Sequence, residues 1–169
     1  NLANITYHGG SFAQDDAFGQ RIKGINLGQD WETINMTDNT DFTLTGDLLY
    51  GNILYLDNFS VLHVGDNVNA RLGLPGSVYR NRGVLDLTNG AYSLTDTSTI
   101  SGDYIGAGQS QFWLNTRLYD DFSPTDMLII NGSSEGTTSI RVNVDPGSPG
   151  ALTYNGIKVV QVDQDAQSN

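Results

Sequence analysis

A repeated unit of short apolar alternations and tight turns restricts the fold more than any other feature. The segment INMTDN at residues 34–39 recurs 19 residues later as ILYLDN at 53–58, and 31 residues further on as VLDLTN at 84–89. Gly-Asp turns at 45–47 and 64–66 share the first spacing. Repeats of about 20 residues suit coils of a parallel β-helix, each of which buries apolar residues only against its neighbours. An antiparallel β-sandwich would use similar turns, but it does not require the repeat. We therefore predict an all-β, right-handed parallel β-helix (solenoid).

Strand-length runs of β-branched and aromatic residues lie between residues that favour turns over helix interiors. Gly totals 20, and Asn, Asp, Thr and Ser recur every few positions. The expected strands are Ile34–Met36, Phe42–Leu44, Ile53–Leu56, Val61–Val64, Val84–Leu87, Tyr92–Leu94, Gln111–Leu118, Met127–Ile130, Ser139–Val144 and Ile157–Val162. Asn at the turns tolerates left-handed backbone angles, and stacked Asn side chains can hydrogen-bond along the axis.

The C-terminal third departs from the repeat, as a cap would. A solenoid ends in unpaired strand edges and an apolar floor, so it needs a capping element. A strong alternating strand at 111–120 is broken at 121–125, and the two prolines of the 145–150 loop exclude regular structure there. The strands on either side of that loop form a hairpin or a widened coil. We predict β-helix coils over 1–109 and a β-hairpin-like cap over 110–169, within one continuous domain.

Composition excludes several classes of function. The formal net charge of -11 repels nucleic acid and anionic lipid. Without cysteine, the chain has no disulfide, no thiol nucleophile and no thiolate metal site. No run approaches the roughly 20 apolar residues of a membrane helix, so direct membrane insertion is not expected. The chain begins in polar sequence at Asn1 without a signal peptide, as an excised piece of a longer protein would.

Three ordered motifs near the C-terminus carry a resemblance to a known family. They comprise Asp126, Leu128, Ile130 and Gly132, then Ile140, Val142 and Asn143, and finally Thr153, Gly156, Ile157, Val159, Val160 and Val162. Over about residues 110–163 the chain resembles the end of the passenger domain in bacterial autotransporters, the type V secretion proteins. It departs from the usual pattern at Asp145-Pro146 and at Tyr154-Asn155, both in loops.

The resemblance implies the autochaperone, or junction, region of such a passenger. That region would fold first at the cell surface, act as a template for the β-helix, and support outer-membrane translocation and surface stability of a virulence protein. The resemblance extends to members that drive actin-based motility. The implied partners are the upstream passenger β-helix and the downstream membrane β-barrel of the same polypeptide, with host proteins bound through other passenger regions. The implied location is the bacterial cell surface, after export through the periplasm, or release outside the cell.

Catalytic chemistry has little support in the sequence. Adjacent acids such as Asp15-Asp16 and Asp120-Asp121 point to opposite faces of a strand, whereas glycosidic cleavage needs two carboxylates held across a sugar. The isolated His8 and His63 form no metal motif, and no cofactor is expected. We expect no enzyme, and a polysaccharide-acting β-helix enzyme ranks behind a surface adhesin that binds host protein or glycan.

Candidate residues for folding and capping therefore lie in the C-terminal third. Trp113 and Tyr119 are expected to be packing anchors of the cap, and Asp120 a turn former. The full set of candidates is Trp113, Leu118, Tyr119, Asp120, Asp126, Gly132, Gly156, Ile157 and Val160.

Overall fold

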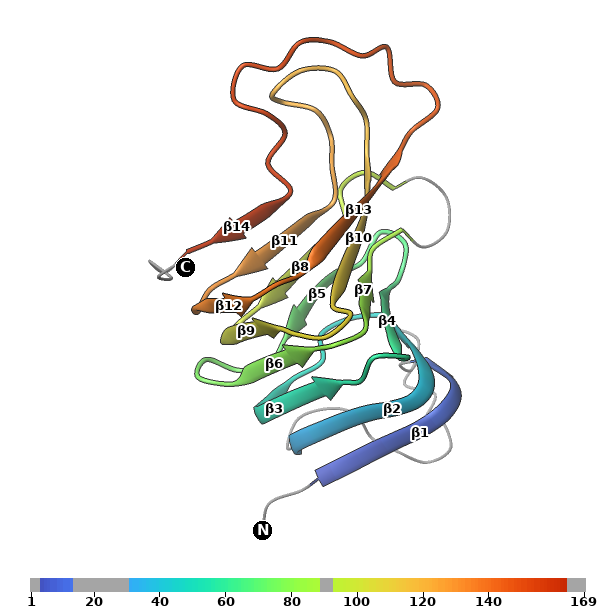
Figure 1. Cartoon of the computed structure of the whole chain (residues 1–169), viewed down its shortest axis with the longest axis vertical. Helices are drawn as coiled ribbons and strands as arrows, with labels where there is room; N and C mark the ends of the chain where they lie inside the picture. The colour runs from blue at the N-terminus through green and yellow to red at the C-terminus, as the bar shows by residue number, and fades with distance from the viewer. Residues whose placement is uncertain (1–3, 14–30, 89–92, 164–169) are drawn as a thin grey trace.

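Parallel strands wind into a solenoid of about five turns in the computed structural model. The structure describes residues 4–13, 31–88 and 93–163. Successive coils rise from the N-terminal end to two long C-terminal loops (Figure 1). The predicted all-β parallel β-helix is confirmed. Within the described ranges, no helix is long and apolar enough to cross a membrane.

Each complete coil contributes one strand to each of three faces. The first face stacks β3 (Tyr50–Leu56), β6 (Val78–Asn81), β9 (Asp103–Gly106) and β12 (Ser134–Gly136). The second stacks β4 (Val61–Val64), β7 (Val84–Asp86), β10 (Gln111–Thr116) and β13 (Ser139–Val144). The third stacks β5 (Asn69–Leu72), β8 (Thr97–Ile100), β11 (Met127–Ile130) and β14 (Val160–Val162).

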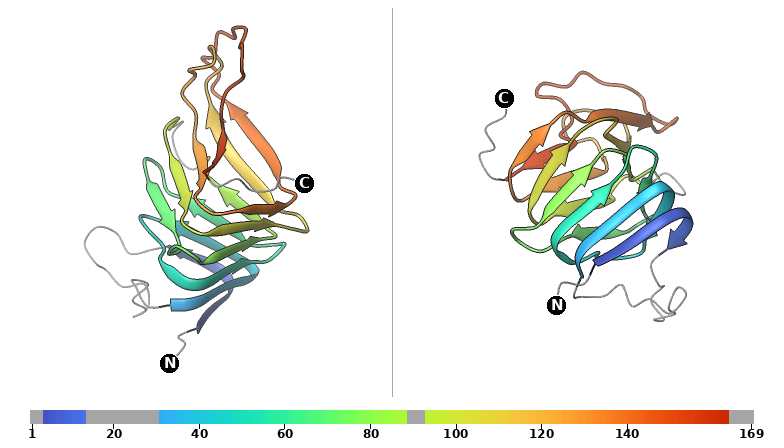
Figure 2. Two further views of the ribbon diagram at one scale, coloured as in Figure 1. Left: turned by 90° about the vertical axis from the view of Figure 1, so that its left-hand side faces the viewer. Right: turned by 60° about the horizontal axis from the view of Figure 1, so that its bottom comes forward.

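The long strand β2 (Trp31–Leu44) serves two faces at once. Its first half pairs with β3 and its second half with β4, while β1 (Asn4–Ala13) pairs beneath it. The bend lies at Asp38 and Asn39, whose φ angles of 58° and 64° are left-handed. These angles agree with the expected role of Asn in turns. The coils can be followed from below in Figure 2.

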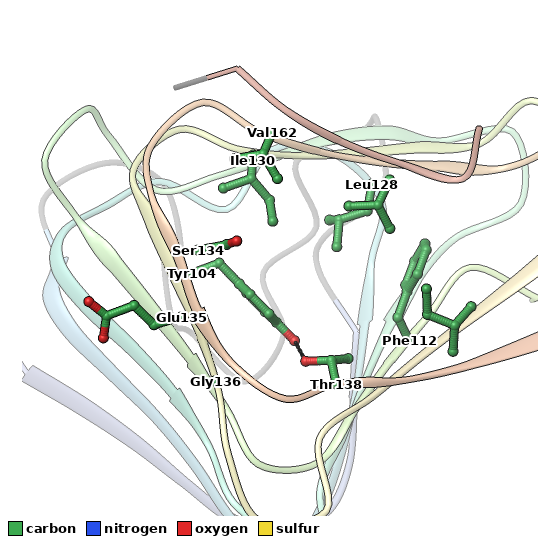
Figure 3. Close-up of a pocket in the computed structure, with 11 residues that line it drawn as sticks. Tyr104, Phe112, Leu128, Ile130, Ser134, Glu135, Gly136, Thr138 and Val162 are labelled. Carbon is green, nitrogen blue, oxygen red and sulfur yellow. Dashed lines mark hydrogen bonds between the residues drawn. The ribbon is translucent and has the colours of Figure 1, made fainter. Parts of the chain in front are cut away.

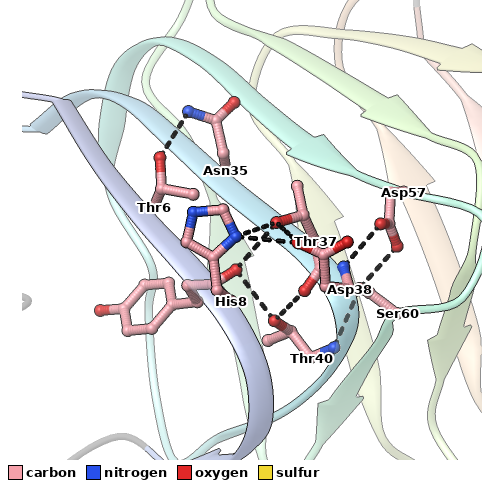
Figure 4. A network of polar contacts seen from close by, with 9 residues as sticks. Thr6, His8, Asn35, Thr37, Asp38, Thr40, Asp57 and Ser60 are labelled. Carbon is pink, nitrogen blue, oxygen red and sulfur yellow. Dashed lines mark hydrogen bonds and ion pairs between the residues drawn. The ribbon is translucent and has the colours of Figure 1, made fainter.

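Side chains from three coils hold this corner (Figure 4). The Asp57 carboxylate accepts the Asp38 backbone N–H at 2.7 Å and the Ser60 hydroxyl at 2.7 Å. The Ser60 hydroxyl oxygen accepts the Thr40 N–H, and His8 of β1 contacts the Asp38 carboxylate at 2.9 Å. Burial would raise the pKa of Asp57, but these hydrogen bonds outweigh it and lower the pKa. The corner is therefore joined from coil to coil by short polar contacts.

Inward positions form apolar columns along the axis. On the second face, Phe42, Leu62, Leu85 and Phe112 lie one above another and are all buried. Strand residues alternate between buried and half-buried, as expected where one face of a strand meets the core. The core is thus a stack of layers, one from each coil.

The coil register differs from the sequence repeat by one residue. The repeat placed Ile34 opposite Ile53, whereas the structure pairs Ile34 with Leu54, both buried, while Ile53 is only half-buried. A one-residue slip would turn every apolar side chain to the wrong face. The third copy, at Val84, pairs with Val61 on another face and does not continue the Ile53 strand.

Three expected strands match in full: Val61–Val64, Met127–Ile130 and Ser139–Val144. The closing strand is shorter than expected, since only Val160–Val162 pairs, opposite Leu128–Ile130. For the expected strand Tyr92–Leu94, Ser93 and Leu94 lie in no strand, and Tyr92 is outside the described residues. The prediction missed β1, β5, β6, β8, β9 and β12.

Candidate folding template in the C-terminal coils

The last coil, β12 to β14, is a widened coil. Strands β13 and β14 each pair in parallel with the coil beneath, so the 145–150 loop does not join a hairpin. Two long connections leave the coils: the lower excursion, residues 117–126, and the upper excursion, residues 145–159. Both extend beyond the stacked strands (Figures 1 and 2). An antiparallel bridge between Thr116 and Thr125 closes the lower one and gives it a hairpin-like base.

The inward columns stay open at the last coil. Ile140, Val142 and Val144 are 47%, 46% and 40% exposed, although they continue columns that are buried below. A cavity of about 270 Å³ lies between Ile140 and the coil beneath, lined by Tyr104, Phe112, Leu128, Ile130, Ile140, Val160 and Val162, among others. Inside it the Tyr104 and Thr138 hydroxyls lie 2.7 Å apart (Figure 3).

Asp126 is a buried carboxylate that links two coils. Its two oxygens accept backbone N–H groups of Asp96, in the coil below, at 3.0 Å and of Asn115 at 2.7 Å. Burial raises the pKa of Asp126 to about 7, although both backbone hydrogen bonds act to lower it. The side chain fixes the start of β11 against two neighbouring segments.

An ion pair holds the upper excursion against the lower one. The Arg117 guanidinium donates to the Asp145 carboxylate at 2.5 Å from Nε, and its second nitrogen contacts the same oxygen. The Gly147 N–H and Arg117 lower the pKa of Asp145. The Leu118 N–H donates to the Ser148 hydroxyl, and the Gly150 N–H donates to the Leu118 carbonyl. The two excursions are therefore joined at their bases.

Asp121 joins the excursions again near their tips. Its carboxylate accepts the backbone N–H groups of Tyr154, Asn155 and Gly156 at 2.7, 3.0 and 3.2 Å. Three N–H groups around one carboxylate form an anion-binding nest. From the sequence, Asp121 was expected to break the 111–120 strand, and no partner was predicted for its carboxylate. Its place just after a broken strand was the signal for a loop role.

The structure places Asp120 in a turn, where its carboxylate accepts the Phe122 N–H and its carbonyl accepts the Ser123 N–H. Gly132 stacks on Gly102, and a Cβ there would lie 2.5 Å from the Gly102 carbonyl oxygen. Gly156 has a left-handed φ of 84° and open space around it. Both glycines meet a backbone requirement.

The expected aromatic anchors lie outside the core. Trp113 is half-buried on the outer face, with the Arg141 guanidinium of the last coil 4.5 Å from its ring centroid. Tyr119 is exposed and contacts Arg117, and Leu118 is exposed as well. The inward positions beside Trp113 belong to Phe112 and Leu114, which strand alternation left unassigned. The roles of Trp113 and Tyr119 in folding stay predictions.

Ile157 and Val160 are half-buried. Val160 belongs to β14 and pairs with Leu128 of β11. The expected asparagine stacking occurs between Asn143 and Asn115, whose side chains hydrogen-bond at 2.7 Å between neighbouring coils. This contact lies on a strand face, and of the turn asparagines for which we expected stacking, Asn89 lies outside the described residues.

In the described part of the chain, no group of three or more His, Asp or Glu side chains is arranged so that it could hold a metal ion. Asp15 and Asp16 lie outside the described residues. The Asp121 carboxylate is occupied by backbone N–H groups, so the Asp120-Asp121 pair does not present two carboxylates across a groove.

Comparison with known proteins assigns the family. The model described as Autochaperone Domain Type 1 matches residues 76–169, more than half of the chain. The chain belongs to this family. The match begins upstream of the expected boundary at residue 110 and takes in β6 to β14. The autochaperone domain is therefore part of an autotransporter passenger that folds as a β-helix.

Two relatives of the chain are described as autotransporters. The protein described as "Probable autotransporter YfaL" from Escherichia coli (strain K12) is 36% identical over 131 residues, 78% of this chain and 9% of that protein. "Adhesin BmaC autotransporter" from Brucella suis biovar 1 (strain 1330) is 37% identical over 82 residues, 48% of this chain and 2% of that protein. The chain thus spans less than a tenth of either relative. No solved structure matches it.

Proposed function

We propose that residues 110–169 are the folding template of the passenger, and that residues 1–109 are coils that assemble on it. One observation carries the proposal: strands on the two sides of residue 110 pair in parallel register. Gln111–Trp113 pair with Val84–Asp86, and Met127–Ile130 pair with Thr97–Ile100. A preformed C-terminal unit would offer these edges to the preceding coil.

Three further features support a unit that can form early. Asp126 of the template binds the backbone of Asp96 in the preceding coil, which fixes where that coil attaches. The Arg117–Asp145 pair and the Asp121 nest tie the template to itself through its own loops. Because a solenoid folds by adding coils to a nucleus, a self-clamped terminal unit limits the number of wrong starts.

The proposal includes the setting of the parent protein. Its partners would be the upstream passenger and the membrane β-barrel of the same polypeptide. It would act during export through the periplasm to the bacterial cell surface, from which the passenger could also be released. A part in virulence, including actin-based motility, stays a prediction, since neither relative named above is described in those terms.

Two buried phenylalanines in one column test the template. Phe112 lies in the template. Below it in the same column lie Leu85 of β7, Leu62 of β4 and then Phe42 of β2, which is therefore well outside the template. In the full-length autotransporter, Phe112→Ala should remove most of the protease-resistant passenger at the cell surface. Phe42→Ala, a matched loss of ring volume, should leave the C-terminal coils resistant. Equal loss of resistance in the two variants would contradict a template at this end.

A surface-binding role is the second candidate. Phe122, Leu152 and Tyr154 on the excursions are 92%, 97% and 99% exposed, as side chains in a contact surface would be before a partner binds. If replacing all three by serine abolished binding of a host protein or glycan and left export and protease resistance unchanged, the excursions would serve binding and not folding.

A further inference from the structure

His63 lies between two carboxylates that belong to the coils below and above it. It projects from the outer face of β4, with Asp41 of β2 on one side and Asp86 of β7 on the other. Its Nδ1 is 3.0 Å from Asp86 Oδ2, and its Nε2 is 3.3 Å from Asp41 Oδ1. The side chains of His63, Asp86 and Asp41 are 20%, 7% and 51% exposed, so the contact with Asp86 is the more sheltered.

The number of protons on the ring decides how many of these contacts are favourable. A neutral imidazole carries one N–H, and its other nitrogen is an acceptor. Ionised carboxylates only accept, so a neutral His63 would turn one lone pair towards a carboxylate oxygen. Only the imidazolium ion donates to both partners. The other Asp86 oxygen accepts the Thr88 N–H at 2.7 Å and the Thr88 hydroxyl at 2.6 Å, and both bonds favour the ionised carboxylate.

We propose that His63 is a pH-sensitive clamp that ties the β2, β4 and β7 coils together when its ring is protonated. Deprotonation leaves a single donor, so the side-chain contact with one of the two neighbouring coils is lost. The clamp lies outside the proposed template and does not depend on it.

The charges around His63 favour the protonated form from both packed strands. Asp41 faces it from β2 and Asp86 from β7, while the other residues of β4 are uncharged. The hydrogen bond with Asp86 raises the pKa of His63; burial opposes this, and the charges of Asp86 and Asp41 add to the rise. Burial would raise the pKa of Asp86, but the His63 and Thr88 bonds outweigh it and lower the pKa.

The direction of the pH effect follows from linkage. The folded pKa of His63 lies above the ordinary histidine value of 6.5. The stabilisation is therefore complete below about pH 6.5 and is lost as pH rises through the folded pKa. Each unit of difference between folded and unfolded pKa changes the folding equilibrium constant about tenfold.

Nitrogen-15 NMR of the His8→Gln variant of the whole 169-residue chain observes His63 alone, because the chain has two histidines. Below the folded pKa, both ring nitrogens should carry protons that exchange slowly with water. The titration midpoint should lie at higher pH than in the same protein unfolded in concentrated urea. Equal midpoints in the folded and unfolded protein would overturn the clamp.

Charge-matched variants separate the clamp from the general acidity of the chain. Asp41→Asn should lower the His63 midpoint, whereas Glu135→Gln removes the same charge from the last coil and should shift it much less. Between about pH 5.5 and about pH 9, the urea midpoint should fall more in His8→Gln than in the His8→Gln, His63→Gln double variant. Identical pH profiles, or equal shifts from Asp41→Asn and Glu135→Gln, would refute the proposal.

Discussion

The middle coils and the last coil use the same inward columns but are stabilised differently. Phe42 and Leu62 are fully buried because another coil covers them, whereas Ile140 continues their column and is nearly half exposed. In place of apolar burial, the upper excursion of the last coil contacts the lower excursion of the coil beneath, from Asp145 to Arg117 and from the 154–156 backbone to Asp121. Burial in a solenoid thus depends on the next coil, and the terminal coil depends on loops.

Neighbouring positions in one column should show this contrast most strongly. Leu114 and Val142 are paired in register, but Leu114 is buried and Val142 is half exposed. Leu114→Ala should cost about 2–5 kcal/mol of unfolding free energy through lost burial and a cavity. Val142→Ala should cost about 1 kcal/mol, because part of its apolar surface already meets water. Urea unfolding measures both, and equal costs would mean that the last coil is covered in solution.

Replacing either of two glycines by alanine should have an intermediate effect on the unfolding free energy. The pair separates the cost of steric crowding from the cost of backbone strain. An alanine at Gly132 would place its Cβ against the Gly102 backbone, so Gly132→Ala should cost about 1–3 kcal/mol. Gly156 has no heavy atom within 4 Å of an added Cβ, but its φ is left-handed. Gly156→Ala should therefore cost only about 1 kcal/mol. Thermal unfolding of both variants checks the order, and a costlier Gly156→Ala would mean that the upper excursion is packed more tightly than it is here.

Asp126 should give the smallest change and the clearest pH dependence. Its pKa is raised by burial to about 7, so its contribution favours folding below the ordinary aspartate value of 3.8 and is lost as pH rises through about 7. Asp126→Asn does not titrate, and near pH 4 it should cost about 1 kcal/mol for a weakened hydrogen bond to one backbone N–H. The deficit should shrink as pH rises from about 4 to about 7, which urea midpoints across this pH range would measure. A constant deficit would show that Asp126 does not titrate in this window.

Local composition was sufficient to predict the strands with a clean apolar alternation. Val61–Val64 and Met127–Ile130 place an apolar residue at every inward position, and both were predicted with their observed bounds. Strand β8, TSTI, turns Ser98 inward, and β9, DYIG, turns Gly106 inward, so neither has a clean apolar alternation and both were missed. Their β structure comes from pairing with neighbouring coils that are already in place.

The template contacts could be predicted only in part. Asp120 sits in a turn, as predicted, whereas Gly132 was named only as part of a family motif and lies in a close backbone contact. The partners of Asp121 and Asp145 could not be found from sequence, because each contact joins loops about 30 residues apart. Trp113, a salient aromatic residue, lies outside the core, since strand alternation fixes two faces without saying which is inward.

The sequence by itself determined the all-β class, the coil repeat and the C-terminal family motifs, since turn residues and strand alternation are local properties of the chain. Only the tertiary structure decided the one-residue register, the open last coil, the loop clamps and the position of His63 between two acids. These features depend on which residue of one coil lies above which residue of the next. That choice is made by the burial of whole columns, and no single segment contains the information.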